Sequence, residues 1–177
     1  MPRYIAFLRA INVGGHVVKL QRLKALFESL GFAEVETFIA SGNVIFKSPA
    51  KSAAALEGKV EQLLQRELGY EVKTFIRSDR EVSDVAATDP FGALAGATLY
   101  VGFLKAEADR ATAERLQAAQ TNVDDFALVG RELYWRCRGL SSESTFSGTK
   151  LEKTLGMATT LRNVNTVRRL AAKYPAA

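Results

Sequence analysis

The sequence is poor in the residues that form disulfides and metal centres. Its 177 residues include one cysteine, Cys137, and one histidine, His16. A single cysteine excludes a disulfide within the chain and is typical of a protein from a reducing compartment. One histidine and one cysteine are also too few for an ordinary zinc site. We therefore predict neither a bound metal nor a cofactor.

Long apolar runs are absent as well. No apolar stretch approaches the roughly 20 residues that a membrane-spanning helix needs, and the one near the N-terminus is too short for a signal peptide. Apolar residues make up 47% of the sequence and charged residues 24%, as in an ordinary globular protein. We therefore expect a cytoplasmic protein with no membrane partner.

The positive charge is unevenly distributed. The formal net charge is +5, and residues 1–149 hold equal numbers of basic and acidic side chains. The whole excess therefore lies in residues 150–177, where Glu152 is the one acidic residue. Such asymmetry favours an anionic partner, either a small molecule or a nucleic acid. The alternative is a solvated helix face that only keeps the protein soluble.

The apolar pattern of the first half predicts the element order β-α-β-β-α-β. Residues 3–9, 34–40, 43–48 and 70–77 have the composition of strands, and residues 19–31 and 52–68 have helical spacing. This order is that of the ferredoxin-like, or split βαβ, unit. Its strand order 4-1-3-2 brings the loop after the first strand and the hairpin around Ser41 and Gly42 to the same sheet edge.

The pattern then begins again. Residues 98–105 favour a strand, residues 107–119 a helix, and a second hairpin surrounds Gly130, with LYW in the place of VIF. We interpret this as an internal duplication, which makes the fold α+β with two ferredoxin-like units. The expected halves are residues 1–78 and 98–177, joined by a connecting helix and loop at 79–97. We expect the second half to lack its last strand and to end in one basic helix over residues 159–174.

The sequence LRAINVGGH at residues 8–16 contains the first candidate site. Gly14 and Gly15 permit positive φ and a close approach of the backbone to a ligand. The helix that follows lacks a capping side chain, so its first amides are available to a phosphate or carboxylate. The other candidate donors at this edge are Arg9, Asn12, His16, Ser41 and Asn43. The alternative is a tight turn whose amides bond to the hairpin or to water.

The C-terminal segment contains a second candidate site. Its sequence TLRNVNTVRRL offers forked and amide donors of the kind that bind oxyanions. The candidate residues are Arg162, Asn163, Asn165 and Arg169. The alternative for these residues is helix capping and surface solvation.

Three functions remain open from the residues. The leading hypothesis is a protein that binds a phosphate-bearing or other anionic ligand, a nucleotide or a nucleic acid. The alternative is an enzyme for a small phosphorylated or carboxylated substrate, with His16 as its acid-base group. A scaffold that binds another protein is the third. A catalytic pair of His16 and Cys137 is not expected, because Cys137 shares a strand face with Leu133 and Trp135 and is interpreted as core.

The motifs LRAINVGGH, SGNVIF, DPF and TLRNVNTVRRL resemble a bacterial family catalogued as domain of unknown function 1697. The resemblance implies a duplicated ferredoxin-like α+β fold and no established activity. Ala10 stands where members usually have glycine, so we expect no positive φ at this position. Val164 stands where they usually have tryptophan, which argues against an aromatic residue stacking on a ligand there. Leu161 stands where a second threonine is common.

Overall fold

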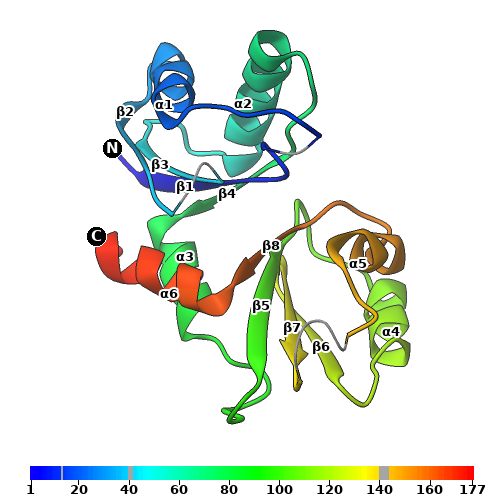
Figure 1. Cartoon of the computed structure of the whole chain (residues 1–177). Coiled ribbons are helices and arrows are strands. Elements are labelled where there is room, and N and C mark those ends of the chain that lie inside the picture. The colour runs from blue at the N-terminus through cyan, green and yellow to red at the C-terminus, as the bar shows by residue number, and fades with distance from the viewer. Residues whose placement is uncertain (13, 40–41, 140–143) are drawn as a thin grey trace. The chain divides into compact units, whose positions relative to one another are not determined.

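The computed structural model describes residues 1–12, 14–39, 42–139 and 144–177. They form two compact units, which we call unit 1 (Met1–Asp84 with Leu170–Ala177) and unit 2 (Val85–Arg169). Each contains a four-stranded antiparallel sheet with helices packed on it (Figure 1). The α+β class and the duplicated ferredoxin-like architecture are therefore confirmed.

Unit 1 has the strand order β2-β3-β1-β4, the order expected from the sequence. Helices α1 and α2 cover one face of this sheet (Figure 1). Leu23 and Phe27 of α1, with Val60 and Leu64 of α2, are fully buried in the resulting core. The elements are β1 (Arg3–Leu8), α1 (Leu20–Ser29), β2 (Ala33–Thr37), β3 (Asn43–Lys47), α2 (Ala53–Leu68), β4 (Thr74–Ser78) and the start of α3 (Asp79–Ala87), whose residues from Val85 onward belong to unit 2.

Unit 2 repeats this topology with the order β6-β7-β5-β8. Its elements are β5 (Thr98–Phe103), α4 (Arg110–Ala118), β6 (Asp124–Val129), β7 (Glu132–Cys137), α5 (Gly148–Leu155), β8 (Thr160–Asn163) and the start of α6 (Val164–Lys173), whose residues from Leu170 onward belong to unit 1. The expectation that the second half lacks its last strand is wrong, because β8 pairs with β5. Residues 159–163 extend along this strand, and the terminal helix begins only at Val164.

The strand registers show which residues of the two units correspond. Tyr4 lies opposite Phe46 in unit 1, and Tyr100 lies opposite Trp135 in unit 2. Both pairs are stacked with an interplanar angle of 29°, at centroid distances of 5.9 and 4.9 Å. The correspondence of VIF with LYW is therefore confirmed. Cys137 is fully buried in the same core cluster as Leu133 and Trp135, as its strand position predicted.

The last strand of each unit also corresponds. Ser78 of β4 lies opposite Tyr4, and Asn163 of β8 lies opposite Tyr100. A helix starts directly after each of them, α3 after Ser78 and α6 after Asn163. The junctions β4–α3 and β8–α6 are thus equivalent, which permits a direct comparison of their chemistry.

Carboxylates satisfy the outward-facing amides of the edge strand β4. An edge strand otherwise presents unpaired N–H groups, which favour unwanted strand pairing. Three such bonds are made from Thr74 N to Glu61 Oε1 (2.9 Å), from Ile76 N to Glu57 Oε1 (2.9 Å) and from Ser78 N to Glu81 Oε2 (2.8 Å). Unit 2 repeats the first of them, since Thr159 N donates to Glu152 Oε1 at 3.1 Å.

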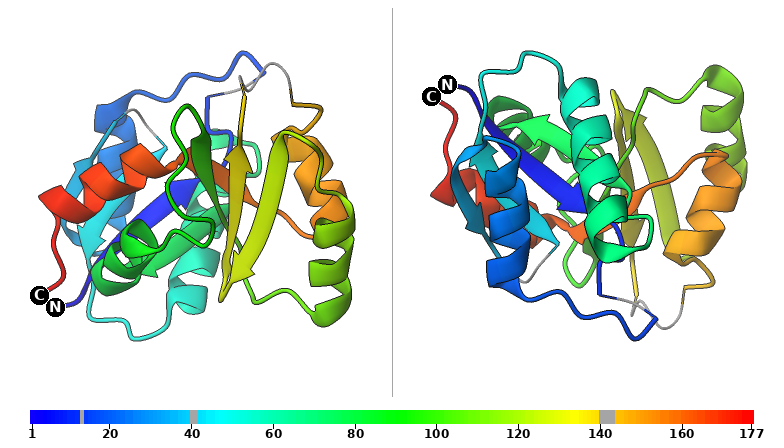
Figure 2. Two further views of the ribbon diagram at one scale, coloured as in Figure 1. Left: turned by 90° about the horizontal axis from the view of Figure 1, so that it is seen from below. Right: turned by 90° about the horizontal axis from the view of Figure 1, so that it is seen from above.

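The C-terminal residues pack against the first strands of unit 1. Tyr174 Oη donates to the carboxylate of Glu36, and its ring meets Phe38 edge to face. Arg3 Nη1 donates to the carbonyl of Pro175 at 3.2 Å, so that the two termini lie side by side (Figure 2). No helix in the described part of the chain is long and apolar enough to cross a membrane.

Candidate functional site

The end of β1 lies beside the hairpin between β2 and β3, while the closeness of residues 11–16 to this hairpin stays a prediction. Leu8 N donates to the carbonyl of Gly42 at 2.8 Å, and Arg9 N donates to the carbonyl of Lys73 at 2.9 Å. Both glycines of the loop have left-handed φ angles, 64° at Gly14 and 82° at Gly15, and both are exposed. Ser41 lies outside the residues that the structure describes.

Several polar groups of this loop are used within unit 1. Asn12 Oδ1 accepts from Val18 N at 2.9 Å, at the approach to α1, whose N-cap Lys19 makes no side-chain cap bond. Asn43 is buried, and its Nδ2 donates to the carbonyls of Phe38 and Ile39. These two asparagines thus hold the backbone of the loop and of the hairpin.

His16 is exposed and stacks on Tyr70, with ring centroids 3.9 Å apart. Tyr70 Oη in turn donates to the carbonyl of Ile11 at 2.7 Å. The histidine ring therefore rests against the tyrosine that braces the start of its own loop. Both the binding and the acid-base role of His16 stay predictions.

The expectation for Ala10 is wrong. Its φ is 54°, in the left-handed region, although it has a Cβ. The backbone amides of Leu8 and Arg9 are fixed by Gly42 and Lys73, so the chain must turn sharply at the next residue. The resulting strain is of the order of 1 kcal/mol.

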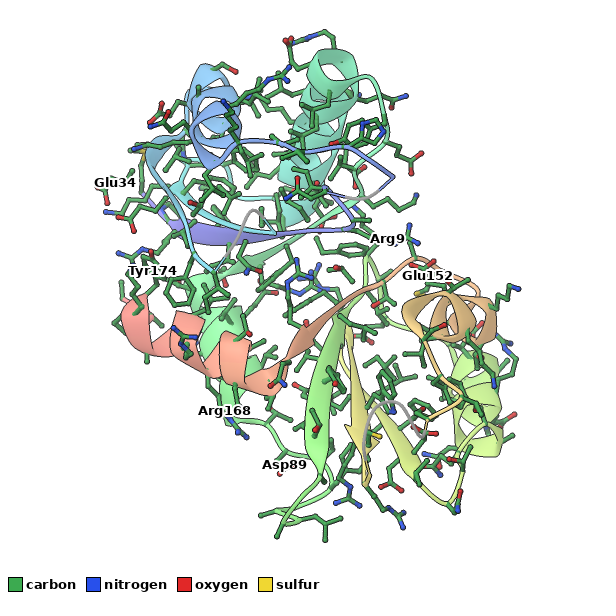
Figure 3. The ribbon with its side chains drawn as sticks, viewed as in Figure 1. Arg9, Glu34, Asp89, Glu152, Arg168 and Tyr174 are labelled. Atoms are coloured by element: carbon green, nitrogen blue, oxygen red, sulfur yellow. The ribbon has the colours of Figure 1, made fainter. Side chains whose placement is uncertain are left out.

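The described residues of unit 2 include a cleft of about 280 Å³. It lies where the connection 89–97 meets the ends of β5, β7 and β8 and the start of α6. Figure 3 labels two of its residues, Asp89 from the connection and Arg168 from α6. The lining residues are Asp89, Gly92, Ala93, Leu94, Ala97, Thr98, Leu99, Arg136, Asn163, Val164, Asn165 and Arg168.

Arg136 is a fixed cation in the wall of the cleft. Its Nε donates to Asp125 Oδ2 at 2.9 Å, and its Nη1 lies 3.3 Å from the carbonyls of Phe91 and Gly92. The guanidinium also lies over the Phe91 ring, 4.9 Å from its centroid. Hydrogen bonds from Arg138 and Arg136 hold the pKa of Asp125 below its usual range. Arg136 thus links the DPF motif (residues 89–91) to the sheet.

The start of α6 contributes amide and guanidinium groups to the cleft. Asn163 Oδ1 accepts from Asn165 N at 2.9 Å and so caps the helix, in agreement with the capping alternative given for this segment. Arg168 is exposed, and its Nη1 lies 3.5 Å from Asn165 Oδ1, at the limit of a hydrogen bond. Arg168 is therefore loosely held, in contrast to Arg136.

We expected Arg162 in a helix over residues 159–174, but it lies in β8. Its Nη1 donates to Thr160 Oγ1 at 2.8 Å and to the carbonyl of Leu161 at 2.9 Å. Burial lowers the pKa of its guanidinium to about 10. Arg169 is exposed and does not line the cleft. The cleft thus contains two of the four residues expected in the terminal segment, Asn163 and Asn165.

The equivalent junction in unit 1, β4–α3, contains acidic side chains that bond to its own backbone amides. Ser78 and Glu81 form a capping box, with Ser78 N donating to Glu81 Oε2 and Glu81 N donating to Ser78 Oγ. Thr166 stands in the place of Glu81 and has no carboxylate to offer the Asn163 amide. Residues 79–84 contain three acids and one arginine, whereas the equivalent residues 164–169 contain two arginines and no acid. The charge of the helix start is therefore reversed in unit 2.

Sequence reasoning missed Arg136 and Arg168. Arg136 alternates with Trp135 and Cys137 along β7, so the period-two pattern shows that it points away from the core. That pattern does not say what it faces. Among the described residues, no group of three or more histidines, cysteines or carboxylates is arranged to hold a metal ion.

Comparisons with known proteins place the chain in a family without assigning a ligand. The family described as "Protein of unknown function (DUF1697)" matches residues 1–134, so the segment with Asn163 and Asn165 lies beyond the match. No curated protein matches. The solved structure of the conserved bacterial protein SP0830 from Streptococcus pneumoniae is 21% identical, with a TM-score of 0.77 over 99% of both chains, a likeness of fold alone. Because the family match covers most of its residues, this chain belongs to the DUF1697 family of proteins of unknown function.

Proposed function

We propose that the protein binds a small anionic ligand, bearing a phosphate or a carboxylate, in the cleft of unit 2. The observation that carries this proposal is the reversed charge at the start of α6. Where unit 1 has the acids Asp79 and Glu81, unit 2 has Val164 and Thr166, and Arg168 is added. An outside anion takes the role that Glu81 has at the equivalent junction of unit 1.

The neighbouring groups suit such a ligand. Helix N-termini attract anions through unpaired amides and the helix dipole. Arg136 keeps a fixed orientation, because Asp125 and two carbonyls hold it. Arg168 is exposed and weakly bonded, so it can turn toward a bound oxyanion at little cost. Together they offer one rigid and one adaptable guanidinium to the same ligand.

The size of the cleft favours a small molecule over a nucleic acid strand. Its volume of about 280 Å³ lies at the lower end of the roughly 300–1,000 Å³ typical of ligand pockets. The loop of Arg9, Asn12, Gly14, Gly15 and His16 stays a second predicted site.

Calorimetric titration with inorganic phosphate and with acetate tests the proposal. We expect Arg168→Ala to weaken binding roughly tenfold or more, since it removes a charge-assisted hydrogen bond. The matched control is Arg169→Ala, which removes the same charge from the next position of α6 but does not line the cleft. Equal losses in the two variants, or no binding of either anion to the unmodified protein, would refute it. Loss of phosphate binding in His16→Gln with no loss in Arg168→Ala would instead move the site to unit 1.

A further inference from the structure

Both polar and apolar side chains line the cleft. Asn163, Asn165 and the two arginines Arg136 and Arg168 line it from β7, β8 and α6. The remaining lining is mostly apolar and comes from the connection, from β5 and from the first residue of α6. Its members are Ala93, Leu94, Ala97, Leu99 and Val164.

Leu94 is the most informative of these side chains. It is 47% exposed, one of the few large apolar residues of the described chain that water reaches. It belongs to a segment whose ends are set by turns at Gly92 and Gly96, both with φ of 78°. An exposed leucine that lines a concave site together with guanidinium and amide groups gains by burial when an apolar group enters.

We infer that the ligand carries its phosphate or carboxylate on an apolar body about the size of one aromatic ring. This inference rests on the proposed function and adds the chemistry of the ligand's other end. The volume supports it, because about 280 Å³ is roughly twice the approximately 150 Å³ of an engineered cavity that holds benzene. An inorganic oxyanion alone leaves the apolar side chains of the lining in contact with water.

The anionic end lies against Arg168 and the start of α6, and the apolar body lies against Leu94 and Leu99. Val164, the first residue of α6, also lines the cleft and is buried. Asp89 keeps the connection in shape, since its Oδ1 accepts from Phe91 N and Gly92 N at 3.1 Å. Its negative charge at the rim also disfavours ligands with a second anionic group.

The test compares matched pairs of probes by amide NMR titration, which measures weak binding and locates it. The pairs are phenyl phosphate with inorganic phosphate, and benzoate with acetate. We expect the ring to improve affinity about tenfold in the preferred pair, through burial of apolar surface. The largest shifts are expected at residues 92–99 and 163–168. The pair with the larger ring effect identifies phosphate or carboxylate as the anionic group.

Two variants separate this inference from the proposed function. Leu94→Ser is expected to remove most of the affinity difference between the ring-bearing and the ring-free probe of a pair. The control Val129→Ser changes a valine in the same unit that is 43% exposed and does not line the cleft. Ring-bearing and ring-free probes of equal affinity, still dependent on Arg168, would overturn this inference and leave the proposed function standing. No binding of any probe would overturn both.

Discussion

Arg136 and Asp125 repeat in unit 2 the ion pair that Lys47 and Glu34 form in unit 1. Arg136 Nε donates to Asp125 Oδ2 at 2.9 Å, and Lys47 Nζ donates to Glu34 Oε1 at 2.8 Å. Lys47 lies opposite Arg3 and Arg136 opposite Leu99, which are equivalent register positions. In unit 2, Arg138 also donates to the carboxylate of Asp125, and Arg136 donates to the Phe91 carbonyl in the wall of the cleft.

Replacement of this carboxylate is expected to destabilise the protein. Asp125→Asn should lower the free energy of unfolding by about 2 kcal/mol near neutral pH, since it weakens hydrogen bonds to a charged, buried group. The pKa of Asp125 is lowered in the folded state, so its contribution is present above the unfolded pKa of about 4 and is lost as pH falls through the folded value. Urea unfolding at several pH values should therefore show the two proteins converging in acid. A constant difference down to about pH 2 would contradict this account.

Ala10→Gly is expected to stabilise unit 1. The left-handed φ of 54° strains an alanine but not a glycine. This relief slightly exceeds the entropy that glycine adds to the unfolded chain, so we expect a net gain of about 0.5 kcal/mol in the free energy of unfolding, measured by thermal or urea unfolding. Ala95→Gly is the matched control, because Ala95 is an exposed loop alanine without positive φ and should be destabilised. Loss of stability in both variants would show that Ala10 is unstrained.

Much of the fold followed from the sequence because its signals were local. The alternation of Leu133, Trp135 and Cys137 predicted their common burial, and all three lie in one core cluster. The strand order of unit 1 followed from the topology of the split βαβ unit, and it places the end of β1 beside the hairpin, as the bond from Leu8 to Gly42 shows.

The missed features depend on contacts between distant segments. Strand β8 has only four residues and is followed directly by α6. The helical spacing of Val164, Val167 and Leu170 therefore predicted a helix that also covered the strand residues. The left-handed φ of Ala10 is imposed by hydrogen bonds to Gly42 and Lys73 on either side of β1. The cleft exists because the connection 89–97 folds back onto the sheet end, a placement that no local pattern specifies.

The carboxylate of Glu57 should be important for unit 1. It is buried, accepts from Ile76 N at 2.9 Å and lies 3.9 Å from the guanidinium of Arg77. Glu57→Ala leaves a buried amide and a buried cation poorly satisfied, so we expect a loss of about 3 kcal/mol in urea unfolding. Glu57→Gln keeps an acceptor for Ile76 N, so its loss in the free energy of unfolding should be clearly smaller than that of Glu57→Ala. Equal losses would show that charge, rather than the edge-strand hydrogen bond, dominates.

Alkaline pH should unfold the protein partly through Tyr134. Burial in unit 2 raises its pKa to about 12, above the usual value of 10.0. A raised folded pKa means that its contribution is fully present below about pH 10 and is lost as pH rises toward about 12. We therefore expect Tyr134→Phe to flatten the fall in the free energy of unfolding over this interval. Fluorescence-detected unfolding measures it, and an unchanged slope in the variant would exclude Tyr134 as a cause.

Nucleic acid is one alternative to a small ligand, and the salt dependence of binding distinguishes the two. Contacts from Arg168 and Arg169 alone neutralise about two phosphates, so affinity for single-stranded RNA or duplex DNA should fall only roughly tenfold between about 50 and 200 mM salt. Such weak, shallow binding, measured by fluorescence anisotropy, is what we expect of a basic helix start beside a small-molecule cleft. A loss of about a thousandfold would require six or more phosphate contacts. That result, abolished in the double variant Arg168→Ala/Arg169→Ala, would make this face a nucleic-acid surface in place of the proposed cleft.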